Sequence, residues 1–175
     1  MKPLICGVLG VALTLAVSPS QAGAPEPTYE QTREWIVATL NNYAGYSGAN
    51  AALSYRNVSM EGCQLRFTTL TETREGYTDT DTFTVALDSV KSVLWGTVSN
   101  PPRGYVLFTT ESAITFSKQR VSSLIGHQPE SSNGATRVAA IEFGKPGGDY
   151  ADLASHMKSA ILRAASLCKV QIAAN

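Results

Sequence analysis

The sequence is poor in the residues from which recognisable catalytic and metal sites are built. It has three cysteines and two histidines, and 16% of its residues are charged. The histidines, His127 and His156, lie about thirty positions apart, which is no recognised spacing for metal ligands. We therefore expect no metal and no cofactor, and we assign no catalytic residue from the sequence.

An excess of either charge is also missing. Lys and Arg number 14, as do Asp and Glu, so the formal net charge is zero. Binding to a nucleic-acid backbone is favoured by a basic face, and an acidic or basic tail needs a run of like charges. The sequence has neither feature, so we expect no nucleic-acid partner.

The one long apolar run lies at the N-terminus. Met1-Lys2 is a short positive segment, Pro3 to Val17 is apolar, and Ser18 to Ala22 has the small residues of a cleavage site. The run is shorter than the roughly 20 residues that a membrane span needs. Cys6 lies at its start, whereas a lipoprotein cysteine would lie at its end. We predict a signal peptide that is cleaved after Ala22.

These features divide the chain into a leader and one domain. Residues 1–22 are the predicted signal peptide, 23–27 a flexible lead-in, and 28–175 a single globular domain, since the chain is too short for two comfortable ones. The mature protein is expected to be secreted or periplasmic, with no transmembrane segment.

Removal of the leader takes Cys6 with it and leaves two cysteines, Cys63 and Cys168. Two cysteines in an exported protein favour a disulfide, and two free thiols are the alternative. Cys63 shares the apolar face of a predicted strand with Leu65 and Phe67, and Cys168 lies on the apolar stripe of a predicted helix. Both patterns place the sulfur atoms where a covering helix meets the sheet.

Two stretches have helical periodicity. The first runs from Tyr29 to Tyr43 and begins with a capping box between Thr28 and Gln31. The second runs from Asp149 to about Val170, has apolar residues three or four positions apart, and has Asp149 as its N-cap.

Between the two helices the period changes from 3.6 to 2, which predicts strands. We expect them at Leu53–Met60, Cys63–Leu70, Thr78–Leu87, Val90–Val98, Tyr105–Thr109, Ala113–Ser117 and Thr136–Phe143. Glu61-Gly62 is the expected link of the first hairpin, and 118–135 lacks a clear period and is expected to be a loop. The fold class is α+β: an antiparallel sheet or partly closed barrel of about seven strands, with an N-terminal helix and a long C-terminal amphipathic helix packed on it.

This order of elements, with strands from Leu53 to Phe143 and an Ala-rich helix from Tyr150 to Cys168, resembles the pleckstrin-homology-like superfold. The resemblance implies a barrel that is closed by the C-terminal helix. Lipid-binding members of that group have a basic first hairpin. Here the tip, Ser59 to Gly62, has no Lys or Arg, which argues against binding of lipid headgroups.

Several motifs suit a chemical role, and each has a plainer interpretation that we favour. They are Ser47 in a Gly-x-Ser-Gly linker, the pair Asp152 and His156 four residues apart on a helix, the glycine turn Gly144–Gly148, the pair Asp79 and Asp81, and the sequon Asn57-Val58-Ser59. We interpret Asp79 and Asp81, which alternate with threonines, as part of a solvent-facing strand surface.

The sequence therefore predicts an exported, non-catalytic binding or structural module of the envelope. The 118–135 loop is the expected surface for a protein partner or small ligand, because loops on a rigid scaffold often carry recognition. The alternative is an exported hydrolase whose site is assembled from residues distant in sequence.

Overall fold

The computed structural model describes residues 26–100, 102–123, 128–144 and 149–173. Its elements are α1 (Tyr29–Tyr43), β1 (Gly45–Ser47), β2 (Ala51–Glu61), β3 (Gln64–Thr73), β4 (Tyr77–Ala86), the short 3-10 helix η1 (Leu87–Ser89), β5 (Val90–Ser99), β6 (Pro102–Ser122), β7 (Glu130–Gly144) and α2 (Tyr150–Ala173). The predicted fold class, α+β with a helix before and after the strands, is confirmed. The predicted leader lies outside the described residues.

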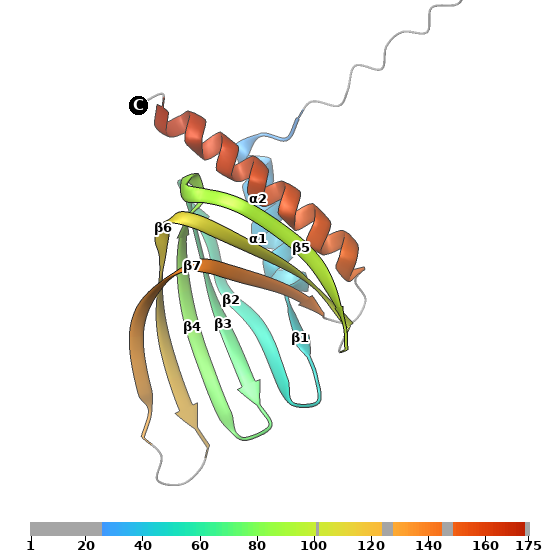
Figure 1. The fold of residues 1–175 in the computed structure, drawn as a ribbon, viewed down its shortest axis with the longest axis vertical. Coiled ribbons are helices and arrows are strands. Elements are labelled where there is room, and N and C mark those ends of the chain that lie inside the picture. The colour runs from blue at the N-terminus through green and yellow to red at the C-terminus, as the bar shows by residue number, and fades with distance from the viewer. Residues whose placement is uncertain (1–25, 101, 124–127, 145–148, 174–175) are drawn as a thin grey trace, which may run out of the picture.

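The strands form a closed barrel with one additional strand. They are ordered β4-β3-β2-β1-β7-β6-β5, and a further pairing of β4 with β6 closes six of them into a ring. β5 is left outside the ring and pairs with the first half of β6. Only β1 and β7 run parallel among the described pairs. Figure 1 shows the curved strands with α2 lying across one end.

β6 corrects two expectations. Tyr105–Thr109 and Ala113–Ser117 belong to this one long strand, and a register shift between Thr109 and Ile114 separates its two halves. The three residues Glu111-Ser112-Ala113 break the alternation at that point, so the pattern reads as two strands.

The expected loop at 118–135 is also wrong in large part. β6 continues to Ser122 and β7 begins at Glu130, and the two remain paired from Lys118–Ser132 to Arg120–Glu130. The signal was missing because Lys118 and Arg120 occupy the inward-facing positions, where an apolar residue would have shown the period. His127 lies outside the described residues.

The first hairpin is shifted by one residue. Glu61 pairs with Gln64, so the turn is Gly62-Cys63 rather than Glu61-Gly62. Gly62 has φ 52°, a left-handed conformation that glycine adopts without steric cost. β1 was missed because its three residues are too short to show a period.

The core fills the space between the barrel and the helices. α2 contributes Ala154, Met157, Ile161, Ala164, Ala165 and Cys168, all buried. Their spacing follows the predicted stripe, and α2 covers β5 and β6. The contact is close at Gly104, where an added Cβ would lie 2.1 Å from the carbonyl oxygen of Tyr150. Only glycine lets the start of α2 approach β6 in this way.

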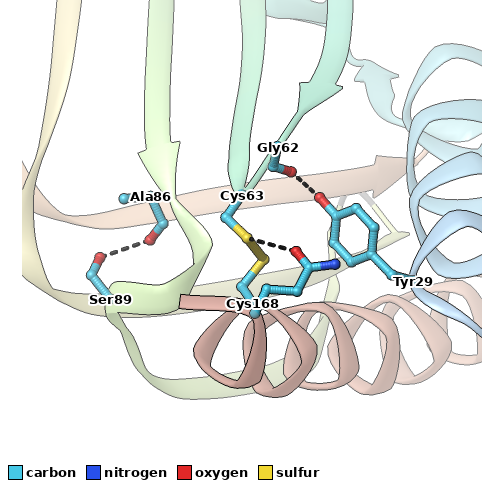
Figure 2. Close-up of a disulfide and its surroundings, with 7 residues drawn as sticks. Tyr29, Gly62, Cys63, Ala86, Ser89 and Cys168 are labelled. Carbon is cyan, nitrogen blue, oxygen red and sulfur yellow. Dashed lines mark hydrogen bonds between the residues drawn. A yellow bond between two sulfur atoms is a disulfide. The ribbon is translucent and has the colours of Figure 1, made fainter. Parts of the chain in front are cut away.

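The predicted cysteine partners lie together at the end of α2. Cys63 and Cys168 are joined in the structure with their Cα atoms 5.6 Å apart (Figure 2). The Tyr29 hydroxyl of α1 donates a hydrogen bond to the carbonyl of Gly62 in the same turn. Lys169 Nζ donates to the carbonyl oxygen of Val90 over 3.3 Å. The first hairpin thus contacts both helices, and the end of α2 is tied to β5 as well.

Candidate functional site

A groove lies between α1 and α2, and we call it the helix groove. It has a volume of about 870 Å³. α1 supplies one wall, α2 the other, and the two residues before the helix cap form one end. The lining residues are Glu26, Pro27, Gln31, Thr32, Trp35, His156, Ser159, Ala160 and Arg163.

Trp35 supplies the large apolar surface of the groove. The helical stripe that anchors α1 includes Ile36 and Leu40, both fully buried, and Trp35 lies beside it with its side chain 37% exposed. A tryptophan held at the margin of a core offers a flat apolar ring and one N–H donor to a ligand. Ala160 and Pro27 add further apolar surface, so the floor of the groove is largely apolar.

Arg163 holds the end of the groove in place. Its Nε and Nη2 donate to the carbonyl oxygen of Pro27 over 3.4 and 3.3 Å, and its Nη1 forms an ion pair with Glu26. The lead-in is thereby fixed to α2. Arg163 and Glu26 also neutralise each other, so this end of the groove presents no uncompensated charge.

His156 and Asp152 form the helix-face pair that the sequence predicts. His156 Nδ1 lies 3.3 Å from Asp152 Oδ2, and both side chains are about 60% exposed. Ser159 lies one turn further along α2, but its hydroxyl donates to the carbonyl oxygen of Ser155 over 3.2 Å. Among the described residues no serine is hydrogen-bonded to His156, so this row of side chains does not form a nucleophile–base pair. Ser47, the other serine considered, is exposed at the end of β1.

The structure corrects the placement of Asp79 and Asp81. These residues lie near the start of β4, on the same face as the buried Val85, and Asp79 is 8% exposed. β4 begins at the end of the barrel away from α2 (Figure 1). Arg120 donates two hydrogen bonds to Asp79, of 2.6 and 2.7 Å, and Lys118 Nζ lies 3.2 Å from it. The solvent-facing interpretation was wrong. The cations that compensate these carboxylates are on β6, about forty positions away in the sequence, so the pattern around Asp79 and Asp81 alone does not reveal them.

The two carboxyl groups of this cluster differ in environment. The hydrogen bonds from Arg120 lower the pKa of Asp79 to about 2, since they favour the charged form. Asp81 lies 3.9 Å from Lys118 Nζ, and its Oδ1 is buried without a hydrogen-bond partner. Burial raises the pKa of Asp81 above its ordinary value. Glu130 of β7 lies opposite Arg120 and interacts with it electrostatically as well. The two cations of the cluster are thus compensated by carboxylates, and the cluster joins β4 to β6.

Tyr55 is a buried titratable group inside the barrel. Its hydroxyl donates to the carbonyl oxygen of Ala140 over 3.3 Å and accepts from the backbone N–H of Glu142 over 3.2 Å. Burial raises the pKa of the Tyr55 phenol, so the group stays protonated and links β2 to β7 across the interior.

The remaining motifs have structural roles. Asp149 Oδ1 accepts from the N–H groups of Ala151 and Asp152 over 3.0 and 3.1 Å, which occupies the start of α2 as its N-cap. Most of the glycine turn before it lies outside the described residues. Asn57 has φ 51° within a bulge of β2. The described part of the chain contains no group of three His, Cys, Asp or Glu placed to hold a metal ion. None of its helices is long and apolar enough to cross a membrane.

The helix groove itself was missed by the sequence reasoning, although its residues carry a weak signal. Trp35 lies just off the apolar stripe of α1. So large an apolar side chain outside the stripe is a weak sign of a surface that binds something. His156, Ser159 and Arg163 recur at helical spacing on one side of α2. Nothing in either helix alone indicates that these two rows face each other.

Comparisons with protein-family models, with curated proteins and with solved structures find no match for this chain. The geometry of the groove is therefore the basis of the functional conclusion.

Proposed function

We propose that the protein is an exported, non-catalytic binding protein whose ligand site is the helix groove. The observation that carries the proposal is a groove with a largely apolar lining that includes the partly exposed Trp35, between two helices that are packed on a closed barrel. An apolar hollow with a few polar groups at its margin is typical of a small-molecule site.

The ligand that this groove suits is a small, uncharged molecule with an aromatic or apolar body. A volume of about 870 Å³ falls within the range of drug-sized ligand sites. The polar groups at its margin already have partners: Arg163 forms an ion pair with Glu26, and His156 Nδ1 contacts Asp152 Oδ2. A charged ligand would have to displace one of these partners, whereas an apolar ring can lie against Trp35 without doing so.

Export is part of the same proposal and is supported by the leader and by the cysteine pair. Residues 1–22 have the three-part pattern of a signal peptide. Two cysteines at bonding distance suit an oxidising compartment. We also infer a pleckstrin-homology-like architecture, on the grounds of the order of elements and of the helix across the end of the barrel. Neither argument bears on which ligand is bound.

The two tryptophans of the chain make the groove directly testable. Trp95→Phe leaves Trp35 as the single tryptophan, so its fluorescence reports on the groove alone. We expect the uncharged dye N-phenyl-1-naphthylamine to bind this variant with saturation at one site and to quench Trp35. Trp35→Ala, and Ser159→Phe in the wild-type background, should weaken dye binding at least tenfold, about 1.4 kcal/mol.

Trp95→Ala is the matched control, because Trp95 is exposed to a similar degree, 40%, but lies on β5 and does not line the groove. Dye binding should be unchanged in this variant. Absence of saturable binding to the wild type, or equal loss in the Trp35 and Trp95 variants, would overturn the assignment of the groove.

A further inference from the structure

β5 is an open edge of the sheet. Within the described residues it pairs with β6 on one side and with no strand on the other. Such an edge presents main-chain N–H and C=O groups along its free side, and these groups are ready to pair with another strand. Lys169 donates a hydrogen bond to the carbonyl oxygen of Val90 at the beginning of β5. The middle and end of the strand are the part that could pair with another strand.

The usual protection of an edge strand is confined to the beginning of β5. Lys91 and a register shift between Val90 and Ser92 lie there. From Ser92 to Ser99 the strand has no charged residue and no proline. Charges, prolines, bulges and a covering helix or loop are devices by which edge strands avoid association. The first three are absent over these eight positions. α2 contacts β5 on the inner face of the sheet, and the free main-chain side of this stretch favours pairing.

Apolar side chains are exposed on both faces of this edge. Leu94 is 60% exposed and lies opposite Leu107 on the outer face of the sheet. Trp95 points the other way, on the face that α2 covers, and is still 40% exposed. A strand added here would therefore need apolar residues on both of its faces.

α2 adds an exposed apolar side chain, Leu162, to the apolar surface on the inner face of β5. Leu162, 43% exposed, lies seven residues before Lys169 and so on the same flank of the helix, about 10 Å back along its axis. α2 runs antiparallel to β5, since Lys169 meets Val90 while Tyr150 lies near Val98. Ten ångströms correspond to about three strand residues, which places Leu162 beside the middle of β5.

We propose that the occupant of this edge is β5 of a second copy of the chain. β5 itself meets the requirements that its edge imposes: it is extended, uncharged from Ser92 to Ser99, and apolar on both faces. Two such strands paired antiparallel about a two-fold axis form an isologous interface, in which Leu94 and Trp95 of each copy face the same segment of the other. The formal net charge of the whole sequence is zero, and loss of Lys2 with the leader changes it only to −1, so electrostatic repulsion between copies is weak.

This interface is independent of the helix groove. The groove uses the flank of α2 with Ser159 and Arg163, whereas the edge uses the flank with Leu162 and Lys169. Ligand binding and pairing can therefore fail separately.

The experiment is sedimentation equilibrium of the mature protein over a wide range of concentrations. We expect a reversible monomer–dimer equilibrium in the wild type. Leu94→Lys places a charge at the centre of the edge and should raise the dimer dissociation constant at least tenfold. Val138→Lys is the control, because Val138 is 44% exposed on β7, which β6 separates from the open edge.

Tryptophan fluorescence is the second measurement, and it identifies which surface the dimer buries. In Trp35→Phe the remaining tryptophan is Trp95, and its emission should shift to shorter wavelength as the dimer forms. If Leu94→Lys changes the circular dichroism spectrum, Thr97→Lys, also exposed on β5, replaces it. A wild type that stays monomeric, a dimer insensitive to both β5 variants, or one dissociated equally by Val138→Lys would overturn the proposal.

Discussion

Asp79 interacts with two cations from a strand forty positions away, and it helps to fix how the barrel closes. It pairs directly with Arg120 across the β4–β6 ladder, and Asp81 pairs with Lys118. Phe83 and Phe116 form the next pair on the same face, with ring centroids 5.9 Å apart. A slip of one strand against the other by a single residue would put the side chains of β4 and those of β6 on opposite faces of the sheet. The order of charged and aromatic side chains along the two strands therefore specifies the register in which β4 pairs with β6 and closes the barrel.

We predict that Asp79→Asn lowers the free energy of unfolding at pH 7 by about 1 kcal/mol. The pKa of Asp79 is lowered to about 2 from 3.8, and full linkage would correspond to roughly 2.5 kcal/mol. Solvent screening reduces this value, since Arg120 is 44% exposed. Because the folded pKa lies below the unfolded one, the stabilisation is complete above about pH 5 and is lost as the pH falls toward 2. Urea unfolding of both proteins at several pH values measures the difference.

Asp81→Asn is the matched control for that prediction. Burial raises the pKa of Asp81, so its charge is a cost at neutral pH and the neutral amide relieves that cost. We expect the variant to be no less stable than the wild type at pH 7. If both variants lose stability equally and independently of pH, the stabilisation does not come from the charge of Asp79.

On the scale of elements, the end of α2 is held by a covalent link as well as by packing. Cys63 and Cys168 are 105 positions apart, and a crosslink over so long a loop restricts the unfolded chain strongly. We predict that Cys63→Ala with Cys168→Ala lowers the free energy of unfolding by about 3 kcal/mol, measured by urea denaturation.

Reduced wild-type protein is the control for this double variant, and the two should unfold at the same urea concentration. Non-reducing peptide mapping by mass spectrometry should find one bridge between Cys63 and Cys168. Two alkylatable thiols in the exported protein, or an unchanged midpoint in the variant, would contradict the prediction.

Elements whose signal is local could be predicted, and elements that depend on distant partners could not. α1 has the predicted bounds, Tyr29–Tyr43, because a capping box and a 3.6-residue period are contained within the helix. The proximity of Cys63 and Cys168 could also be predicted, because Cys63 lies on the apolar face of a strand and Cys168 on the apolar stripe of a helix. β6 was predicted as two strands, and its last residues, 118–122, were taken for a loop. The inward Lys118 and Arg120 look exposed until Asp79 and Asp81 are placed beside them.

The same limit applies to the helix groove. Its walls come from residues 26–35 and 156–163, which are more than a hundred positions apart, and each row reads as an ordinary solvated helix face. Barrel closure and packing of α2 on β5 and β6 bring the rows together. The sequence could name His156 and Asp152 as a pair, but it could not show that Trp35 and His156 line the same groove.

At the scale of the whole molecule, the lead-in (residues 23–27) connects the proposed export with the proposed site, because it follows the expected cleavage site and its last two residues line the groove. Cleavage after Ala22 would leave three residues, Gly23 to Pro25, before Glu26. Arg163 holds Glu26 and Pro27 against α2. The expected cut therefore lies close to the fold but does not remove a residue that lines the groove.

We predict that the mature protein begins at Gly23 and is recovered outside the cytoplasm. Ala22→Trp should abolish cleavage, because a signal peptidase accepts small residues at that position. Ala24→Trp, two residues beyond the expected cut, is the matched control and should be processed normally. Intact mass and N-terminal sequencing of fractionated cells distinguish these results. A chain that keeps Met1 and stays in the cytoplasm would contradict export, and a mature start at Pro25 would move the cut to one residue from Glu26.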